Sequence, residues 1–307
     1  MAQEEVKPDP SSEAKEAPKP KAKRSTTVKV KDERHRLRLT ARDYELLRFI
    51  YEQKFATLEA LYLRYFDSRP NPSDPLPAGF FVARQRLARL RRAGLLITER
   101  VYTDPKAVYL ISQAGLRTLA AKMPEAVYAK ALTGVDFRIF EHDMKVTIVR
   151  VAIARSGKGV KWYPERRIRS EGFAVEAQGY THALPETLIP DGIMVSSKGE
   201  RVAIELEASI RRRSRFQFKI SEYERVMAGD VAVVEKVLFI ATNKTLFNEL
   251  KRLTDKKPGF LVDYYQNYLE SLVTPKARQA LAPKTVVQEV TEAVPPGDSK
   301  NSEVSHV

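Results

Sequence analysis

Three carboxylates lie close together in a stretch of sequence that otherwise reads as two short apolar strands. Asp191 lies in "LIPDGIMV", and Glu205 and Glu207 lie in "RVAIELEA". Side chains at i and i+2 of a β-strand face the same way, so Glu205 and Glu207 share one face of their strand. Asp191 joins that face if the two strands pair through a turn at residues 196–200.

Carboxylates that converge in this way repel one another unless a cation neutralises them. A hard divalent cation does so well, because Mg²⁺ prefers oxygen ligands and usually takes one or two carboxylates together with water and phosphate oxygens. The pattern therefore predicts a site for Mg²⁺ or Mn²⁺ at Asp191, Glu205 and Glu207.

Composition favours a polyanionic partner for such a site. The 307 residues carry a formal net charge of +14, and Lys and Arg gain free energy when they release counterions from a phosphate backbone. Nucleic acid is the first expectation and an anionic membrane surface the second. No apolar run approaches the ~20 residues of a membrane span, no cysteine is present to bind zinc, and no Gly-rich loop cradles a nucleotide phosphate. We expect a soluble cytoplasmic protein with no membrane segment.

The chain length suits two ordinary domains, and both ends read as tails. Residues 1–34 and 283–307 contain too few apolar side chains to form a core and are predicted to be disordered. The stretch from Lys19 to Lys31 is mostly basic. It either adds non-specific phosphate contacts or is a solvated tail with no role.

Residues 35–125 are predicted to form a winged helix-turn-helix. Apolar residues recur at helical spacing after Thr40 and again after Thr57, and both threonines suit an N-cap. Beyond a Pro-rich loop, a third helix, "FFVARQRLARLRRAG", ends at Gly94. Two short strands then flank residues 103–106, where a winged helix has its wing, and the helix "SQAGLRTLAAKM" closes the domain.

The third helix presents Arg and Gln on the sides away from its apolar stripe. Major-groove reading needs these residue types, because Arg bonds guanine and Gln bonds adenine with two hydrogen bonds each. The alternative is a solvated basic face, which describes most surface helices. We predict contact with double-stranded DNA through Arg84, Gln85, Arg86, Arg89 and Arg92 and, in the wing, Lys106.

Residues 134–275 are predicted to form an α/β domain. A helix from about Asp136 to Arg155 has two apolar rows, as expected of a helix that is covered on more than one side. Strands follow at "GVKWYPE", "LIPDGIMV" and "RVAIELEA", then a helix from about Arg215, a strand "KVLFIAT" and a helix "KTLFNELKRL". This order is typical of an α/β layer arrangement. The segment "GFLVDYYQNYLESLV" is predicted to be an amphipathic helix.

Pro190-Asp191, followed after the predicted hairpin by Glu205-Leu206-Glu207, resembles the signature of the restriction-endonuclease-like nuclease superfamily. That signature, PD-(D/E)xK, is Pro-Asp, a gap, then Asp or Glu, any residue and Lys. With the winged helix before it, the chain is similar over roughly residues 38–255 to the replication-relaxation family of bacterial mobile elements, which is related to plasmid mobilisation relaxases built on this nuclease fold. The resemblance implies a restriction-endonuclease-like domain with a mixed central sheet.

The chain departs from the signature at its last position, where Glu207 replaces the usual Lys. Some members of the superfamily carry the lysine on the next helix, so Lys219 is the substitute that the resemblance implies. In that case Asp191 and Glu205 bind the metal, and Glu207 binds the metal or its water. Lys219 steadies the attacking water and the phosphate charge. Glu165 resembles an additional acidic position of such nuclease sites, and His142, on the domain's first helix, lies where related proteins often have a histidine. The implied catalytic set is Asp191, Glu205, Glu207, Lys219, Glu165 and His142.

Each assignment also has a structural alternative. Glu207 then pairs with Arg211 or Arg212, Lys219 is a solvated helix residue, and His142 is a hydrogen-bonded structural histidine. An arginine cluster after the acidic strand either positions flanking DNA backbone or compensates the charge of the acids. This cluster comprises Arg211, Arg212, Arg213 and Arg215.

Two functions remain open from the sequence. The first is a DNA-binding protein of a plasmid or integrative element that acts in mobilisation or replication initiation and nicks one strand by Mg²⁺-dependent hydrolysis. The second is a non-catalytic accessory factor or transcriptional regulator with a degenerate nuclease fold, which the missing lysine favours. A single helix-turn-helix usually reads a short half-site, so a homodimer or another protein of a DNA-processing complex is an expected partner.

Overall fold

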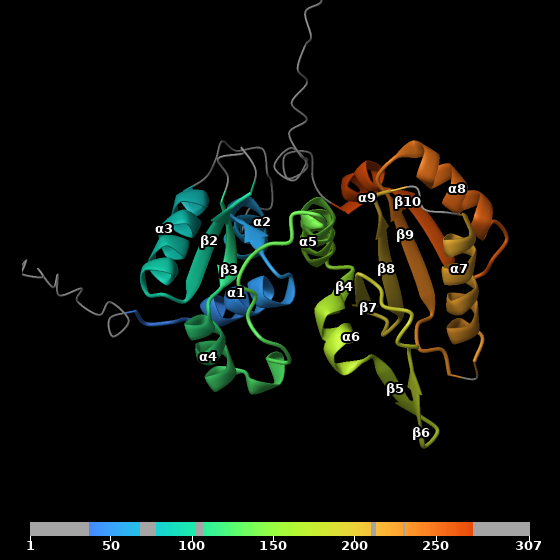
Figure 1. Ribbon diagram of the computed structural model, residues 1–307, viewed down its shortest axis with the longest axis horizontal. Helices are drawn as coiled ribbons and strands as arrows, with labels where there is room; N and C mark the ends of the chain where they lie inside the picture. Colours follow the sequence, from blue (N-terminus) through green and yellow to red (C-terminus); the bar gives the residue numbers. More distant parts are fainter. Residues whose placement is uncertain (1–36, 68–77, 102–106, 210–212, 230, 273–307) are drawn as a thin grey trace, which may run out of the picture.

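The computed structural model describes residues 37–67, 78–101, 107–209, 213–229 and 231–272. Figure 1 shows two units side by side, a smaller one at left and a larger one at right, with helix α5 (Phe140–Ser156) between them. The predicted tails, 1–34 and 283–307, lie outside the described residues. Within the described ranges, no helix is long and apolar enough to cross a membrane.

The first unit has the helices and strands that the sequence predicts, with one short strand in addition. Thr40 caps its first helix in a capping box, in which the Thr40 N–H donates to the Asp43 carboxylate at 2.6 Å and the Thr40 hydroxyl accepts from the Asp43 N–H. Thr57 and Ser112 cap two further helices through their hydroxyls. The elements are α1 (Ala41–Glu52), β1 (Ala56–Thr57), α2 (Leu58–Tyr65), α3 (Ala78–Arg92), β2 (Leu96–Arg100), β3 (Ala107–Ile111) and α4 (Gln113–Lys122).

A small antiparallel sheet completes this unit. Its strand order is β1-β3-β2, so the hairpin of β2 and β3 is extended by the short strand between α1 and α2. Gly94 follows α3 in the left-handed conformation that ends a helix there, with φ of 72°. The predicted hairpin is confirmed, whereas Lys106 at its tip lies outside the described residues.

Arg86 has a partner inside the first unit. Its guanidinium Nε donates to Asp43 Oδ1 at 2.7 Å, and the Asp43 carboxylate is buried. A buried carboxylate requires such a cation, because an unpaired charge in the interior is costly. Arg86 therefore fixes α3 against α1, and its guanidinium is engaged inside the unit.

The second unit is built on a five-stranded mixed sheet, which confirms the predicted α/β class. Strand order is β10-β9-β8-β7-β4, with the first three strands parallel and the last two pairs antiparallel. The elements after α5 are β4 (Gly159–Pro164), α6 (Glu165–Glu171), β5 (Ala174–Ala177), β6 (Tyr180–Ala183), β7 (Gly192–Ser196), β8 (Arg201–Glu207), α7 (Arg213–Met227), β9 (Lys236–Ala241), α8 (Lys244–Thr254), β10 (Phe260–Tyr264) and α9 (Tyr265–Leu272).

Helices cover both faces of this sheet (Figure 1). Val202, Ile204 and Leu206 of β8 belong to the apolar cluster that contains α5 and α9. Ala203, between them in sequence, belongs to the cluster that contains α7 and α8. Alternate residues of β8 thus face opposite layers, as the period of a strand requires.

Four predictions about this unit need correction. The helix predicted from Asp136 begins at Phe140, because the Asp136 carboxylate accepts from the Arg138 N–H and holds a turn before the helix. Glu165 begins α6 instead of ending a strand, and β5 and β6 form a hairpin that the sequence did not predict. The segment predicted as one helix from residue 259 is β10 followed by α9, because residues 260–264 pair with β9 at the edge of the sheet.

The two units share one apolar core. A single cluster of buried side chains includes Leu61 and Leu87 of the first unit and Val149 and Ile240 of the second. The predicted domain boundaries, 35–125 and 134–275, stay predictions. The shared core nevertheless fixes the two units against each other through α5, since interiors pack too densely to slide freely.

Candidate active site

The hairpin of β7 and β8 brings Asp191 to the acidic strand, as the sequence predicts. The two strands pair antiparallel around the turn at residues 196–200, with Gly192 opposite Ile204. Asp191 lies just before β7, and its Oδ2 accepts a hydrogen bond from the Leu206 N–H at 2.7 Å. The Asp191 carboxylate therefore accepts the hydrogen bond that a carbonyl oxygen of a neighbouring strand would accept in a β-sheet. It does so at Leu206, between the two glutamates of β8.

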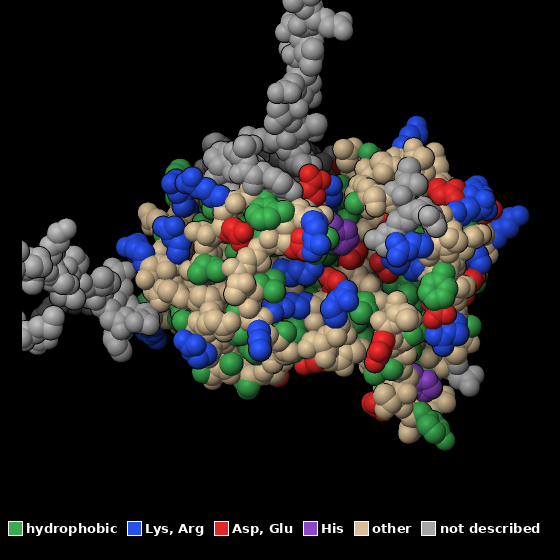
Figure 2. Space-filling view, in the orientation of Figure 1, with side chains coloured by type: hydrophobic (Ala, Val, Ile, Leu, Met, Phe, Trp, Pro, Cys, Tyr) green, Lys and Arg blue, Asp and Glu red, His purple; other side chains and the backbone are tan. Residues whose placement is uncertain are grey.

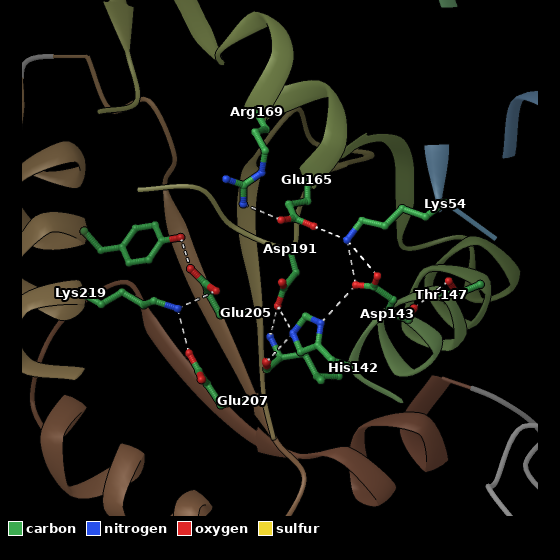
Figure 3. A network of polar contacts seen from close by, with 12 residues as sticks. Lys54, His142, Asp143, Thr147, Glu165, Arg169, Asp191, Glu205, Glu207 and Lys219 are labelled. Carbon is green, nitrogen blue, oxygen red and sulfur yellow. Dashed lines mark hydrogen bonds and ion pairs between the residues drawn. The ribbon is translucent and has the colours of Figure 1, made fainter. Parts of the chain in front are cut away.

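Glu205 and Glu207 face α7 on the same side of the sheet (Figure 3). Both are almost fully buried, and Lys219 of α7 lies between them, with its Nζ 2.9 Å from Glu205 Oε2 and 2.8 Å from Glu207 Oε1. The Tyr223 hydroxyl, one turn further along α7, donates to Glu205 Oε1 at 2.6 Å. Lys219 thus lies at the acids, as the substituted-lysine interpretation requires.

Burial is the largest influence on the pKa values of Glu205 and Lys219. Desolvation raises the pKa of Glu205 to about 7, with further upward effects from Asp191 and Glu207, although the Lys219 ammonium opposes them. The two glutamates in turn raise the pKa of Lys219 against the effect of its own burial. Burial therefore favours the protonated form of Glu205, while the ammonium of Lys219 stays charged beside it.

His142 of α5 joins the same end of the sheet from the other layer. Its Nε2 lies 3.1 Å from the Leu206 carbonyl oxygen and 3.3 Å from Asp191 Oδ2, and its Nδ1 lies 3.5 Å from Asp143 Oδ1. Burial alone would lower the pKa of His142, but the hydrogen bonds and charges of Asp143 and Asp191 raise it to about 10. A charged imidazolium therefore bridges the two aspartates.

Lys54 enters the site from the first unit. Its Nζ lies 2.9 Å from Asp143 Oδ1 and 2.9 Å from Glu165 Oε2, and these acids raise the pKa of Lys54 against the effect of its burial. The Lys54 backbone has a φ of 72°, a conformation that non-glycine residues rarely adopt. Its sequence neighbours are also held on α5: the Gln53 side-chain amide donates to the Thr147 hydroxyl, and Phe55 stacks on Phe140 at 4.9 Å.

An open cleft of about 830 Å³ contains these groups. Figure 2 shows acidic, basic and histidine side chains gathered between the two units, where the cleft opens. All six residues of the predicted catalytic set line it, so the structure brings the whole set together. They are Asp191, Glu205, Glu207, Lys219, Glu165 and His142.

Three residues that line the cleft were missed at the level of sequence: Asp143, Lys54 and Arg169. Asp143 follows His142 directly, so its position beside a predicted residue was an available signal. Lys54 had no such signal, because 89 residues separate it from Asp143 along the chain. Arg169, which donates to Glu165 at 2.7 Å, also follows its partner by one turn.

The residues predicted to bind DNA lie in two places. Arg84, Gln85, Arg89 and Arg92 are exposed on α3. In the arginine cluster, Arg213 and Arg215 are exposed on the first turn of α7, near the acidic strand, while Arg211 and Arg212 lie outside the described residues. The alternative in which Glu207 pairs with one of those two arginines therefore stays untested. Within the described residues, Glu207 pairs with Lys219.

Metal binding would require some rearrangement. No cluster of three or more His, Asp or Glu side chains in the described part of the chain is arranged to hold a metal ion, so the predicted three-carboxylate set is not preassembled. The donor types nevertheless fit Mg²⁺, which commonly takes two carboxylates and completes its shell with water and phosphate oxygens. Asp191 and Glu205 would supply these two carboxylates once His142 and Lys219 move away from their oxygens.

Comparison with families of related proteins matches residues 47–239 to the replication-relaxation family. This match spans more than half of the chain and includes parts of both units. The chain therefore belongs to the replication-relaxation family, and the predicted family resemblance is confirmed. Membership suggests a role in the replication or mobilisation of a plasmid or mobile element. No curated protein and no solved structure gives a significant match.

Replacement of Lys54 tests its place in the site. Lys54→Met leaves Asp143 and Glu165 partly buried without their shared cation, and we expect the free energy of unfolding to fall by about 1–3 kcal/mol. Lys145→Met is the matched control, because Lys145 lines the same cleft but pairs only at 3.6 Å with the exposed Glu141 in the described residues, and it should cost less than about 1 kcal/mol. Urea unfolding at neutral pH measures both, and equal losses would contradict the assignment.

The pH dependence of stability tests the environment of Glu205. The pKa of Glu205 is raised from 4.5 to about 7 in the folded state, so its contribution is fully present below pH 4.5 and is lost as the pH rises towards 7. The free energy of unfolding of wild type relative to Glu205→Gln should therefore fall across that window and level off above it. Urea titrations at a series of pH values measure the difference, with the exposed cleft residue Glu186→Gln as control. A constant difference would show that Glu205 titrates normally.

Proposed function

We propose that the first unit is a winged helix that binds duplex DNA. Its element order, its capped helices and its antiparallel hairpin support this assignment. The exposed stripe of Gln85, Arg89 and Arg92 on α3 suits the major groove, because these side chains can bond base edges and phosphates. The net charge of +14 supports a polyanionic partner.

We further propose that the second unit is a restriction-endonuclease-like nuclease that nicks one DNA strand during mobilisation or replication initiation of a plasmid or integrative element. One observation carries this proposal: the Asp191 carboxylate is bonded to the Leu206 N–H, between Glu205 and Glu207, at the mouth of an open cleft. A hydrophobic protein interior does not require three carboxylates there, since buried charge is costly unless it serves a purpose.

Asp191 and Glu205 would hold Mg²⁺ or Mn²⁺, which when bound supplies an activated water and neutralises charge on the scissile phosphate. Lys219 contributes a fixed positive charge beside Glu205 and Glu207, suited to the charge that develops on the phosphate. His142 holds Asp191 in place, and Glu165 shares Lys54 with Asp143. Hydrolysis needs no covalent intermediate on the protein.

The DNA-binding helix and the cleft lie at different places on the molecule. Figure 1 shows α3 at the outer edge of the first unit, with its small sheet between α3 and α5. The base pairs that α3 recognises and the phosphodiester that is cut are therefore separate positions on the DNA. Arg213 and Arg215, near Lys219 on α7, would contact phosphates beside the cut strand without reading sequence.

A non-catalytic accessory factor or regulator is the second candidate function. The observation that favours it is that Lys219, His142 and Lys54 already neutralise the carboxylates of the cleft. A site balanced in this way retains its fold without a metal ion. A homodimer, a second protein of the DNA-processing complex and a cytoplasmic location stay predictions for both candidates.

Metal binding separates the two candidates without requiring cleavage. At a hundredfold excess over its Kd, Mg²⁺ or Mn²⁺ should raise the melting temperature of the wild type by roughly 5–10 °C, because it binds the folded state only. Asp191→Asn should abolish the rise, while Glu186→Gln, at another acid of the same cleft, should keep it. No rise in the wild type at millimolar metal would support the accessory factor.

A further inference from the structure

Two large apolar side chains are exposed on the outer face of α3. Phe81 is 57% and Val82 is 52% exposed. The opposite face of the helix carries Ala83, Leu87 and Leu90, which are fully buried. Single exposed apolar residues are common on protein surfaces, but these two are adjacent and lie in the first turns of the helix.

Phe81 and Val82 lie on the same stripe as the polar residues assigned to DNA. Phe81, Gln85 and Arg89 follow one another at intervals of four residues, and Val82 lies three residues before Gln85, so all four share one face of α3. Figure 2 shows Lys and Arg side chains along the outer edge of this unit, around α3 in Figure 1. The stripe therefore changes from apolar near the N-terminus of α3 to basic near its C-terminus.

The outward position of Phe81 is fixed by the packing of the helix. The preceding residue, Phe80, turns inward and contacts the Tyr62 ring edge to face at 5.4 Å. Arg86 anchors the middle of α3 to the buried Asp43 of α1. With these two contacts α3 cannot rotate to bury Phe81 and Val82 without breaking an ion pair and an aromatic contact, so their exposure is a stable feature of the surface.

We propose that Phe81 and Val82 determine sequence specificity by packing against the methyl groups of thymines in the major groove. This proposal rests on the proposed DNA binding by α3. The thymine C5-methyl is the apolar group that an A·T pair presents in that groove, and residues near the N-terminus of a recognition helix are those that reach base edges. Burying this methyl group against an apolar side chain is favourable. A polar base edge offers an apolar side chain no such gain.

The neighbouring side chains extend the proposal to a sequence preference. Gln85, one turn after Phe81, bonds adenine with two hydrogen bonds, and adenine is the partner of thymine. The first half of the stripe therefore reads A·T pairs. Arg89 and Arg92 in the second half contact guanine or the backbone. The recognised half-site is A·T-rich at the end that faces the N-terminus of α3.

Replacement of thymine by uracil removes the methyl groups while keeping every Watson–Crick hydrogen bond. A duplex is first selected from a random-sequence pool with the full chain, and its thymine and uracil forms are then compared by fluorescence anisotropy. Wild type should bind the uracil form about fourfold more weakly for each methyl that is buried. Phe81→Ala and Val82→Ala should each reduce this discrimination, and the double variant should bind both forms equally.

Phe218→Ala is the matched control, because Phe218 is an equally exposed phenylalanine, at 59%, on α7. It should keep the full discrimination. Equal binding of the two forms by the wild type, or discrimination that survives in the double variant, would overturn the proposal. A change in oligomeric mass of the variants with unchanged discrimination would instead identify this face as a protein interface and would also overturn it. Failure to enrich any duplex would contradict DNA binding itself, which is a distinguishable outcome.

Discussion

Each buried or partly buried carboxylate at the centre of the cleft must be matched by a cation, and this requirement organises the molecule. Moving an isolated carboxylate into the interior is so unfavourable that it either takes up a proton or finds a positive partner. Lys219 of α7 serves Glu205 and Glu207, His142 of α5 serves Asp191, and Lys54 of the first unit serves Asp143 and Glu165. The site is therefore assembled from three separate parts of the chain.

The contribution of Lys54 explains why the two units form one structure. The segment of residues 53–55 contacts α5 through a hydrogen bond, an ion pair and an aromatic stack, and the apolar cores of the units are continuous beneath it. The region that matches the replication-relaxation family begins inside α1 and ends in β9, so it includes Lys54 as well as the acidic strand. The family unit thus comprises both parts of the site.

The cations that already pair with the carboxylates also decide whether the cleft can bind a metal ion and act as a catalytic site. A bound metal ion has to compete with ammonium and imidazolium groups that already satisfy the same oxygens. Phosphate oxygens of DNA would add negative charge at the mouth of the cleft and change the balance of charges. Metal and DNA are then expected to bind cooperatively, since each neutralises the other.

The features that follow from local periodicity could be predicted from the sequence. The i and i+2 spacing of Glu205 and Glu207 determined their shared face, the hairpin placed Asp191 beside them, and Thr40 marked the start of α1. Features that depend on distant contacts could not. The sequence predicts a helix where the edge strand β10 lies, because five residues are too few to separate the helical period from the strand period, and only the pairing with β9 decides.

Ion pairs between side chains that are distant in the sequence could not be predicted either. Arg86 looks like any exposed arginine of a basic helix until Asp43 is found beneath it, and Lys54 is brought to Asp143 only by the packing of the units. No spacing rule within one element can identify such pairs, since their members lie 43 and 89 residues apart in the chain.

The most direct measurement is incubation of the purified protein with a supercoiled plasmid that carries its native locus, in Mg²⁺ or Mn²⁺, with Glu205→Gln alongside. Open-circular product is expected from the wild type only, while both proteins bind the plasmid. A wild type that binds the plasmid in the presence of metal and leaves it supercoiled, or a Glu205→Gln protein that nicks equally well, would contradict the assignment of the cleft as a nuclease site.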